Sequence, residues 1–97
     1  MKIDKNLKGN TLTITLEGRL DTNTAPELEK EVEVLDGVKK LIFDFKNLEY
    51  ISSAGLRIIL VLHKKMNNQG SITIKNVKEN VKEVFEITGF SDILDIK

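Results

Sequence analysis

The strictest pattern in the sequence is the alternation of polar and apolar residues from Thr11 to Glu17, which reads T-L-T-I-T-L-E. In an extended chain the leucines and the isoleucine fall on one face and the threonines on the other, so the segment is predicted to be a half-buried β-strand. Lys2 to Leu7 is its predicted hairpin partner, because Lys8-Gly9-Asn10 between them has turn chemistry. The chain is therefore expected to begin with a β-hairpin.

After this hairpin, the apolar residues no longer recur every two residues but every three or four, which is the spacing of a helix. Thr24 and Glu27 have the three-residue spacing of a capping box, which predicts the start of the helix. Asp36-Gly37 is predicted to end it. The apolar residues that recur at helical spacing between these limits are Ala25, Leu28, Val32 and Leu35.

Two further strand–helix units are expected. Lys40 to Lys46, which reads K-L-I-F-D-F-K, is apolar on both faces and is predicted to be a central strand. Asn47 to Ile51 is predicted to be a short connection, after which Ser52-Ser53 opens a helix that stops at Asn67 to Gly70. That helix is apolar on most sides and is expected to be buried on most sides. Ser71 to Lys75 alternates again and is the next predicted strand.

A third helix closes the pattern. Asn76 is its predicted N-cap, with Glu79 at the third helical position. Gly89 has the position of a glycine that ends a helix, and Phe90 behind it can make the hydrophobic contact of that motif. Ile93 to Ile96 is either a last short strand or a terminal turn.

This order of elements predicts an α/β fold, a single domain over residues 1–97 with a mixed β-sheet flanked by α-helices. Right-handed crossovers place successive helices on the sheet. Gly18 to Thr24 and Tyr50 to Gly55 are then expected on the same rim, where the ligand and partner sites of such sheets gather.

Charge and composition exclude several classes of function. The chain carries 15 Lys+Arg and 15 Asp+Glu, and this balance argues against a nucleic-acid binder and against a polybasic membrane-surface protein. The longest apolar run, Ile58 to Leu62, is far too short to insert into a membrane. The N-terminus lacks the apolar stretch of a signal peptide, so a cytoplasmic location is expected.

Few residues are available for catalysis or metal binding. There is no cysteine and only one histidine, His63, so neither a cysteine-ligated nor a multi-histidine metal site is expected. No cofactor is predicted either. A self-contained enzyme is disfavoured, because one histidine serves a catalytic triad only if Ser and Asp converge on it.

The most informative stretch is Tyr50 to Leu56, which reads Y-I-S-S-A-G-L. Two adjacent serines stand where a strand leads into an apolar helix, and the simplest interpretation is helix capping. Gly55 fits capping poorly, because a glycine in the first turn destabilises a helix. It fits a site where a neighbouring loop, a phosphate or a partner approaches the backbone. The alternative interpretation is a modifiable serine, since a helix N-terminus favours a phosphate.

Four motifs lie in a fixed order along nearly the whole chain: Gly18-Arg19-Leu20-Asp21 with Thr24-Ala25, Leu41 to Phe45 with Leu48, Ile51 to Leu56, and Ile87 to Phe90. Together they resemble the STAS domain (sulfate transporter and anti-sigma factor antagonist) and, within it, the stand-alone bacterial anti-sigma factor antagonists. The resemblance implies a mixed sheet flanked by helices. It also implies that the unphosphorylated domain binds an anti-sigma factor that is also a serine kinase, which releases a sigma factor. Phosphorylation weakens this complex, and a metal-dependent serine phosphatase reverses it.

The resemblance aligns the family's phosphorylated serine with Ser53. The best-studied pattern has Asp before the acceptor and Ser or Thr after it, whereas here Ser52 precedes it and Ala54 follows, so Ser52 stays a rival acceptor. Asp21 is either a turn carboxylate or part of the partner-binding face. The partner-binding residues that the resemblance implies are Asp21, Thr22, Ser52, Ser53, Ala54, Gly55 and Arg57.

Two other hypotheses stay open at this point. The first is a subunit of a cytoplasmic lipid-transport complex, a role that stand-alone domains of this family also serve. The second is a small hydrolase with Ser53 as nucleophile. It lacks a convincing base, because His63 is ten residues along the same predicted helix, about 15 Å away. Capping of the helix C-terminal dipole is the simpler role for His63.

Overall fold

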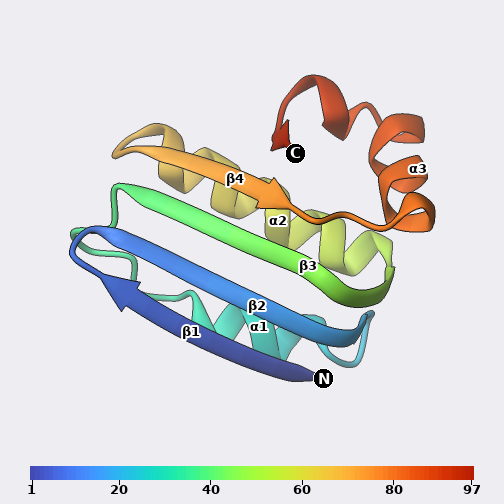
Figure 1. Cartoon of the computed structure of the whole chain (residues 1–97), viewed down its shortest axis with the longest axis horizontal. Helices are drawn as coiled ribbons and strands as arrows, with labels where there is room; N and C mark the ends of the chain where they lie inside the picture. The colour runs from blue at the N-terminus through green and yellow to red at the C-terminus, as the bar shows by residue number, and fades with distance from the viewer.

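The computed structural model describes residues 1–97 and has a five-stranded sheet in the order β1-β2-β3-β4-β5 (Figure 1). The β1 strand runs antiparallel to β2, and all other neighbours are parallel. The predicted mixed sheet with flanking helices is therefore confirmed. The elements in chain order are β1 (Lys2–Lys8), β2 (Thr11–Leu20), α1 (Ala25–Glu31), β3 (Lys40–Ile51), α2 (Ser53–Asn67), β4 (Ser71–Lys75), α3 (Glu79–Ile87), the 3-10 helix η1 (Phe90–Asp92) and β5 (Asp95–Ile96).

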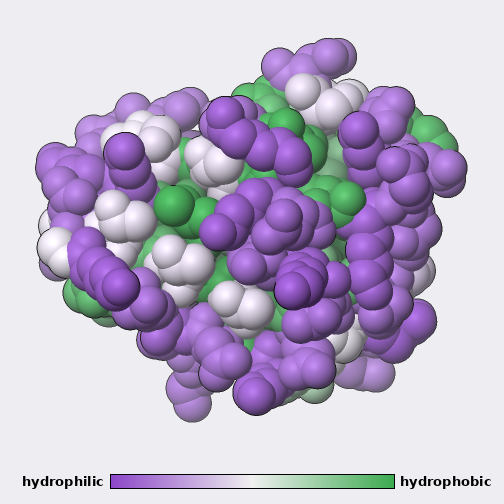
Figure 2. All heavy atoms as spheres, viewed as in Figure 1, coloured by the Kyte–Doolittle hydropathy of each residue, from purple (hydrophilic) through white to green (hydrophobic).

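One face of the sheet is covered and the other is open. Helices α1 and α2 lie behind the sheet in Figure 1, and α3 lies beyond the carboxyl ends of β3 and β4. The core consists of 24 buried apolar residues, and no polar side chain is buried among them. The open face, which Figure 2 shows, is mostly hydrophilic with small apolar patches. The threonines that alternate along β2 are half-buried on it, as the pattern from Thr11 to Glu17 predicts.

The α1 helix is shorter than predicted, because it ends at Glu31 and not at Asp36-Gly37. Apolar spacing misled the prediction, since Val32, Leu35 and Val38 are buried at three-residue intervals outside the helix. Gln69, from the loop after α2, donates hydrogen bonds of 2.6 Å and 2.8 Å to the backbone carbonyls of Leu35 and Val38. These tertiary hydrogen bonds pair backbone carbonyls of an irregular segment, which in a helix would be paired within the helix itself.

The β3 strand is longer than predicted and includes Asn47 to Ile51, which was expected to be a connection. The pairing of β3 with β2 shifts register twice, so that β3 carries extra residues near Phe45 and between Leu48 and Tyr50. Bulges of this kind break the two-residue period. The buried positions of β3 are Leu41, Phe43, Phe45, Leu48 and Ile51, and the change of spacing after Phe45 hides the end of the strand from pattern analysis.

Two predictions of helix capping are wrong: Thr24 stands at the N-cap position of α1 but forms no capping box, and Asn76 is not the N-cap of α3. The Thr24 side chain makes no cap hydrogen bond to α1, so no capping box forms with Glu27. Lys78 and not Asn76 is the N-cap of α3. Asn76 instead adopts a left-handed conformation with φ of 59° and donates a 3.1 Å hydrogen bond to Asp44 Oδ1.

The end of the chain follows the sequence prediction more closely. Gly89 has φ of 80° directly after α3, which is the left-handed conformation expected of a helix-ending glycine. The rings of Phe90 and Phe85 are stacked, with centroids 6.4 Å apart. The last strand is confirmed for Asp95–Ile96 only, because Ile93 and Leu94 form the turn that follows η1.

Candidate functional site

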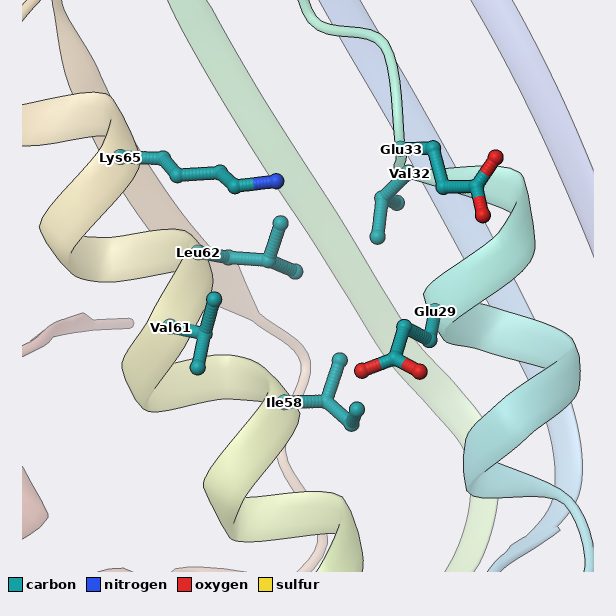
Figure 3. A pocket seen from close by; sticks show the side chains of 7 residues that line it. All are labelled: Glu29, Val32, Glu33, Ile58, Val61, Leu62 and Lys65. Carbon is teal, nitrogen blue, oxygen red and sulfur yellow. The ribbon is translucent and has the colours of Figure 1, made fainter.

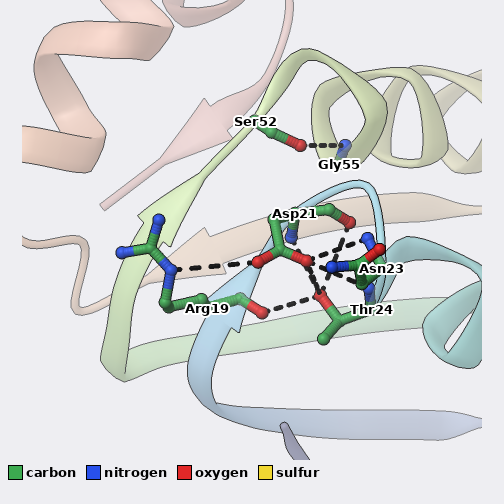
Figure 4. A network of polar contacts seen from close by, with 6 residues as sticks. All are labelled: Arg19, Asp21, Asn23, Thr24, Ser52 and Gly55. Atoms are coloured by element: carbon green, nitrogen blue, oxygen red, sulfur yellow. Dashed lines mark hydrogen bonds and ion pairs between the residues drawn. The ribbon is translucent and has the colours of Figure 1, made fainter.

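The two loops singled out by sequence lie side by side at the carboxyl ends of β2 and β3 (Figure 4). Leu20 pairs with Ile51 at the last register position of the parallel strands. The Ser52 amide then donates a 2.8 Å hydrogen bond to the Leu20 carbonyl. The loop Asp21–Thr24, which leads into α1, is therefore fixed next to Ser52 and the start of α2.

Asp21 is the centre of a dense hydrogen-bond network in the first of these loops. Its Oδ1 atom accepts hydrogen bonds from the amides of Asn23 at 3.0 Å and Thr24 at 3.1 Å, and it lies 3.3 Å from the Thr24 hydroxyl oxygen. The Thr24 hydroxyl also accepts from the Asp21 amide at 2.8 Å and donates to the Arg19 carbonyl at 2.7 Å. The loop is thus tied to the end of β2 by its own side chains.

This network favours the ionised carboxylate of Asp21. The hydrogen bond from the Thr24 amide lowers the pKa of Asp21, and desolvation only partly opposes it. The Nε atom of Arg19 lies 3.8 Å from Asp21 Oδ2 and adds a weaker attraction. The guanidinium of Arg19 also lies 4.2 Å from the centre of the Tyr50 ring, so Arg19 joins the ends of β2 and β3. The turn role of Asp21 is therefore confirmed.

The two serines have different environments. Ser52 is the N-cap of α2, and its Oγ atom accepts a long hydrogen bond of 3.4 Å from the Gly55 amide. Ser53 is the first residue of the helix and is exposed. Capping therefore accounts for Ser52, whereas the Ser53 hydroxyl is accessible and makes no hydrogen bond within the chain.

Gly55 is required because the end of β2 approaches the helix closely. A Cβ atom at this position would lie 2.7 Å from Leu20 Cγ and 3.0 Å from Ile51 Cγ1. Of the three approaches considered from sequence, the neighbouring segment is thus the one observed. The absent side chain at Gly55 allows the Ser52–Gly55 turn to pack directly on the last residues of β2 and β3.

A groove begins beside these loops and separates α1 from α2. Its first hollow, of about 260 Å³, is lined by Thr22, Ala25, Pro26, Glu29, Ala54, Arg57 and Ile58. Three of the predicted partner-binding residues, Thr22, Ala54 and Arg57, therefore line one hollow. Figure 3 shows its continuation, where the Glu29 carboxylate points toward Ile58 across a partly apolar floor, whereas the Glu33 carboxylate points away from Lys65. Sequence analysis did not select Glu29, because nothing in the pattern distinguishes it from the other acids of the same helix.

The remaining candidates lie away from this rim. His63 is on α2, ten residues after Ser53, and its Nδ1 atom is buried without a hydrogen-bond partner. It therefore has no contact with the Ser53 hydroxyl that a nucleophile would need. No group of three or more His, Asp or Glu side chains is placed to hold a metal ion. No helix is both long and apolar enough to cross a membrane.

Comparison with known proteins agrees with this fold. The model of the STAS domain matches residues 2–97. The chain is 35% identical to BtrV of Bordetella bronchiseptica, with 99% of this chain and 85% of that protein covered. It is 31% identical to the anti-sigma-B factor antagonist of Bacillus subtilis, with 99% and 90% covered.

Solved structures give the same fold at lower identity. The Bacillus anti-sigma factor antagonist SpoIIAA superposes with a TM-score of 0.79 in its unphosphorylated form, at 17% identity over 99% of this chain and 87% of that chain. Its phosphorylated form superposes with a TM-score of 0.78, at 18% identity over 99% and 91%. The match to residues 2–97 and the two relatives above 30% identity establish that this chain belongs to the STAS domain family.

Proposed function

We propose that this chain is an anti-sigma factor antagonist that is switched off by phosphorylation of Ser53. In its unphosphorylated form it binds an anti-sigma factor in the bacterial cytoplasm, and this binding releases a sigma factor. The observation that carries the proposal is the 31% identity, over 99% of this chain, with the anti-sigma-B factor antagonist of Bacillus subtilis. The descriptions of the relatives favour this function over that of a lipid-transport subunit.

The site supports a binding role for the rim. The Asp21–Thr24 loop is fixed by its own hydrogen bonds, and Thr22, Ala54 and Arg57 line a hollow that opens next to it. We include Asp21, Ser52, Ser53 and Gly55 in the partner-binding face because they lie at the same ends of β2 and β3. The chain acts by binding and not by catalysis in this proposal, since the accessible hydroxyl of Ser53 has no base beside it.

The partner proposed for this face is an anti-sigma factor with serine kinase activity, and a metal-dependent serine phosphatase removes the phosphate. Ser53 is the proposed site of phosphorylation, because its hydroxyl is accessible. The Ser52 hydroxyl oxygen, in contrast, accepts a hydrogen bond from the Gly55 amide. SpoIIAA, which has the same fold, has been solved in a phosphorylated form. A phosphate on Ser53 adds a charge of about −1.5 to −2 at neutral pH without removing any hydrogen bond of the chain.

The proposal is tested by calorimetry with the cognate anti-sigma factor. Ser53→Asp is expected to weaken binding by at least about tenfold, because a negative charge is placed at the contact face, whereas Ser53→Ala binds like wild type. Circular dichroism spectra confirm that both variants are folded. Unchanged affinity of a folded Ser53→Asp variant would contradict the proposal.

A kinase assay tests the acceptor itself. Wild type, Ser52→Ala and Ser53→Ala are incubated with the cognate kinase and ATP, and phosphate incorporation is measured by mass spectrometry. Incorporation is expected to be lost only in Ser53→Ala. Loss only in Ser52→Ala would move the acceptor by one residue, and no incorporation into wild type would exclude phosphorylation by that kinase.

A further inference from the structure

Arg57 is the charged residue that stands one helical turn after Ser53 along α2. The two residues are four positions apart on one helix, and both are exposed. Side chains in a helix tilt toward its N-terminus, so the Arg57 side chain leans back over the turn that contains Ser53. An acid placed four residues before a base is also the favourable order for an ion pair on a helix.

Arg57 has no ion-pair partner in the unmodified chain. The five ion pairs of the structure involve other residues, and the Arg57 side chain makes no hydrogen bond. Glu29 lines the same hollow as Arg57 and has no ion pair either. Asp21, the nearest acid of the neighbouring loop, is already engaged with Arg19 and with Thr24. The Arg57 guanidinium is thus free to accept a new anion.

We infer that Arg57 binds the phosphate on phosphorylated Ser53, and that this pairing withdraws its positive charge from the groove between α1 and α2. A guanidinium binds a phosphate through parallel N–H donors, as it binds a carboxylate. The phosphate pair is the stronger one because the phosphate carries a charge of about −1.5 to −2 at neutral pH. Ser52 offers no such pairing, because positions five apart lie on different faces of the helix. The inference rests on the proposed phosphorylation of Ser53.

The consequence is a second change at the partner face, beyond the charge of the phosphate itself. Before modification the first hollow holds one acid and one base, Glu29 and Arg57. After modification Arg57 is paired with the phosphate, and Glu29 is the charge that a partner meets there. An acidic side chain of a partner that pairs with Arg57 in the unmodified complex would lose its contact. The phosphate and that partner acid would then exclude each other at a single guanidinium.

The test uses the full chain with phosphoserine installed at position 53 during translation, so no kinase is needed. The second pKa of the phosphate is measured by phosphorus NMR between pH 4 and 8, because a nearby cation stabilises the dianion and lowers this pKa. Wild type is expected to have a phosphate pKa lower by about 0.3 pH unit or more than Arg57→Gln. Arg57→Lys should lie between them. Lys64→Gln removes an equal charge at the far end of α2 and should behave like wild type.

Each outcome decides the inference. Equal phosphate pKa values in wild type and Arg57→Gln, with both proteins folded by circular dichroism, would overturn it. An equal effect of Lys64→Gln would also overturn it, because the effect would then reflect net charge and not a contact. Phosphoserine installed at position 52 should show no dependence on Arg57. Since the kinase plays no part, failure here leaves the proposed function standing, and failure of the kinase assay leaves this pairing testable.

Discussion

Helices α1 and α2 begin at the same rim, one strand apart, but they are held there in different ways. The start of α1 is fixed by polar contacts, with the Asp21 carboxylate and the Thr24 hydroxyl at their centre. The start of α2 has one long side-chain hydrogen bond, from the Gly55 amide to Ser52. The α2 helix is held by burial instead, with Leu56, Ile59, Leu62 and Met66 in the core.

This difference explains how the rim can combine a fixed loop with an exposed hydroxyl at Ser53. The short α1 helix has seven residues and relies on its loop, whereas the 15-residue α2 has a core face that does not depend on its first residue. A charge added at Ser53 therefore changes the surface and leaves the packing of α2 unaltered. The predictions that follow test this contrast, from the largest effect to the smallest.

The largest effect is expected from the buried face of α2. Ile59 is fully buried, and Ile59→Ala should lower the free energy of unfolding by about 2–5 kcal/mol, because it leaves a cavity in the core. Leu60→Ala is the matched control, since Leu60 is the next residue on the helix and is only partly buried. Urea titration gives both values. Equal losses would show that burial does not distinguish the two sides of α2.

The close approach of β2 to α2 gives the second effect. Gly55→Ala places a Cβ atom 2.7 Å from Leu20 Cγ, and such overpacking is expected to cost about 1–3 kcal/mol. The Leu20→Ala background removes the obstructing atoms, so the same substitution should cost less there. Urea titration of the four proteins gives the coupling between the positions. Strictly additive losses would contradict a direct contact between Leu20 and residue 55.

Much of this architecture could be predicted from sequence, because local patterns determine it. The alternation in β2, the apolar stripe of α2 and the glycine after α3 each depend on a few neighbouring residues. The features that were missed depend on contacts between distant residues. Gln69 ends α1 early by binding carbonyls more than 30 positions away, and two bulges in β3 conceal its last five residues.

The candidate site likewise has features that local sequence patterns determine and features that depend on contacts between distant residues. Its place at the ends of two parallel strands follows from topology, and Ser52 as N-cap follows from residue type. Thr24 resembled a cap in sequence but binds the Asp21 amide and the Arg19 carbonyl, a choice that only the folded loop reveals. The hollow that brings Glu29 to Arg57 depends on how α1 packs against α2, which no local pattern encodes.

The third prediction concerns the polar loop before α1 and its response to acid. The lowered pKa of Asp21 means that its ionised form is favoured by folding. Its contribution to stability is therefore complete above the unfolded-state value of 3.8 and is lost as the pH falls through the lower folded-state value. Asp21→Asn should be less stable than wild type at pH 7, and the difference should shrink below about pH 4.

Urea titrations of wild type and Asp21→Asn at pH 7, 5 and 3 measure this difference. Asp44 needs its own control. Burial raises its pKa, but hydrogen bonds from the Asn76 side chain and the Lys46 amide outweigh this and lower it. Introducing Asp44→Asn into wild type and into Asp21→Asn separates the contributions of the two carboxylates to the pH dependence of stability. A difference between wild type and Asp21→Asn that stays constant from pH 7 to pH 3 would show that the Asp21 charge plays no part in holding the loop.

The smallest effect is expected where α2 begins. Ser52→Ala removes one N-cap hydrogen bond of 3.4 Å, a length at which little energy is gained, so the loss should be near the lower limit for N-caps, about 0.5 kcal/mol. Ser53→Ala is the matched control and should change stability even less, because Ser53 is exposed and its hydroxyl is unbonded. Thermal and urea unfolding of both variants give the comparison. A loss above about 1.5 kcal/mol for Ser52→Ala would mean that the start of α2 depends on polar contacts as that of α1 does, and a phosphate at the adjacent residue would then disturb the helix as well as its surface.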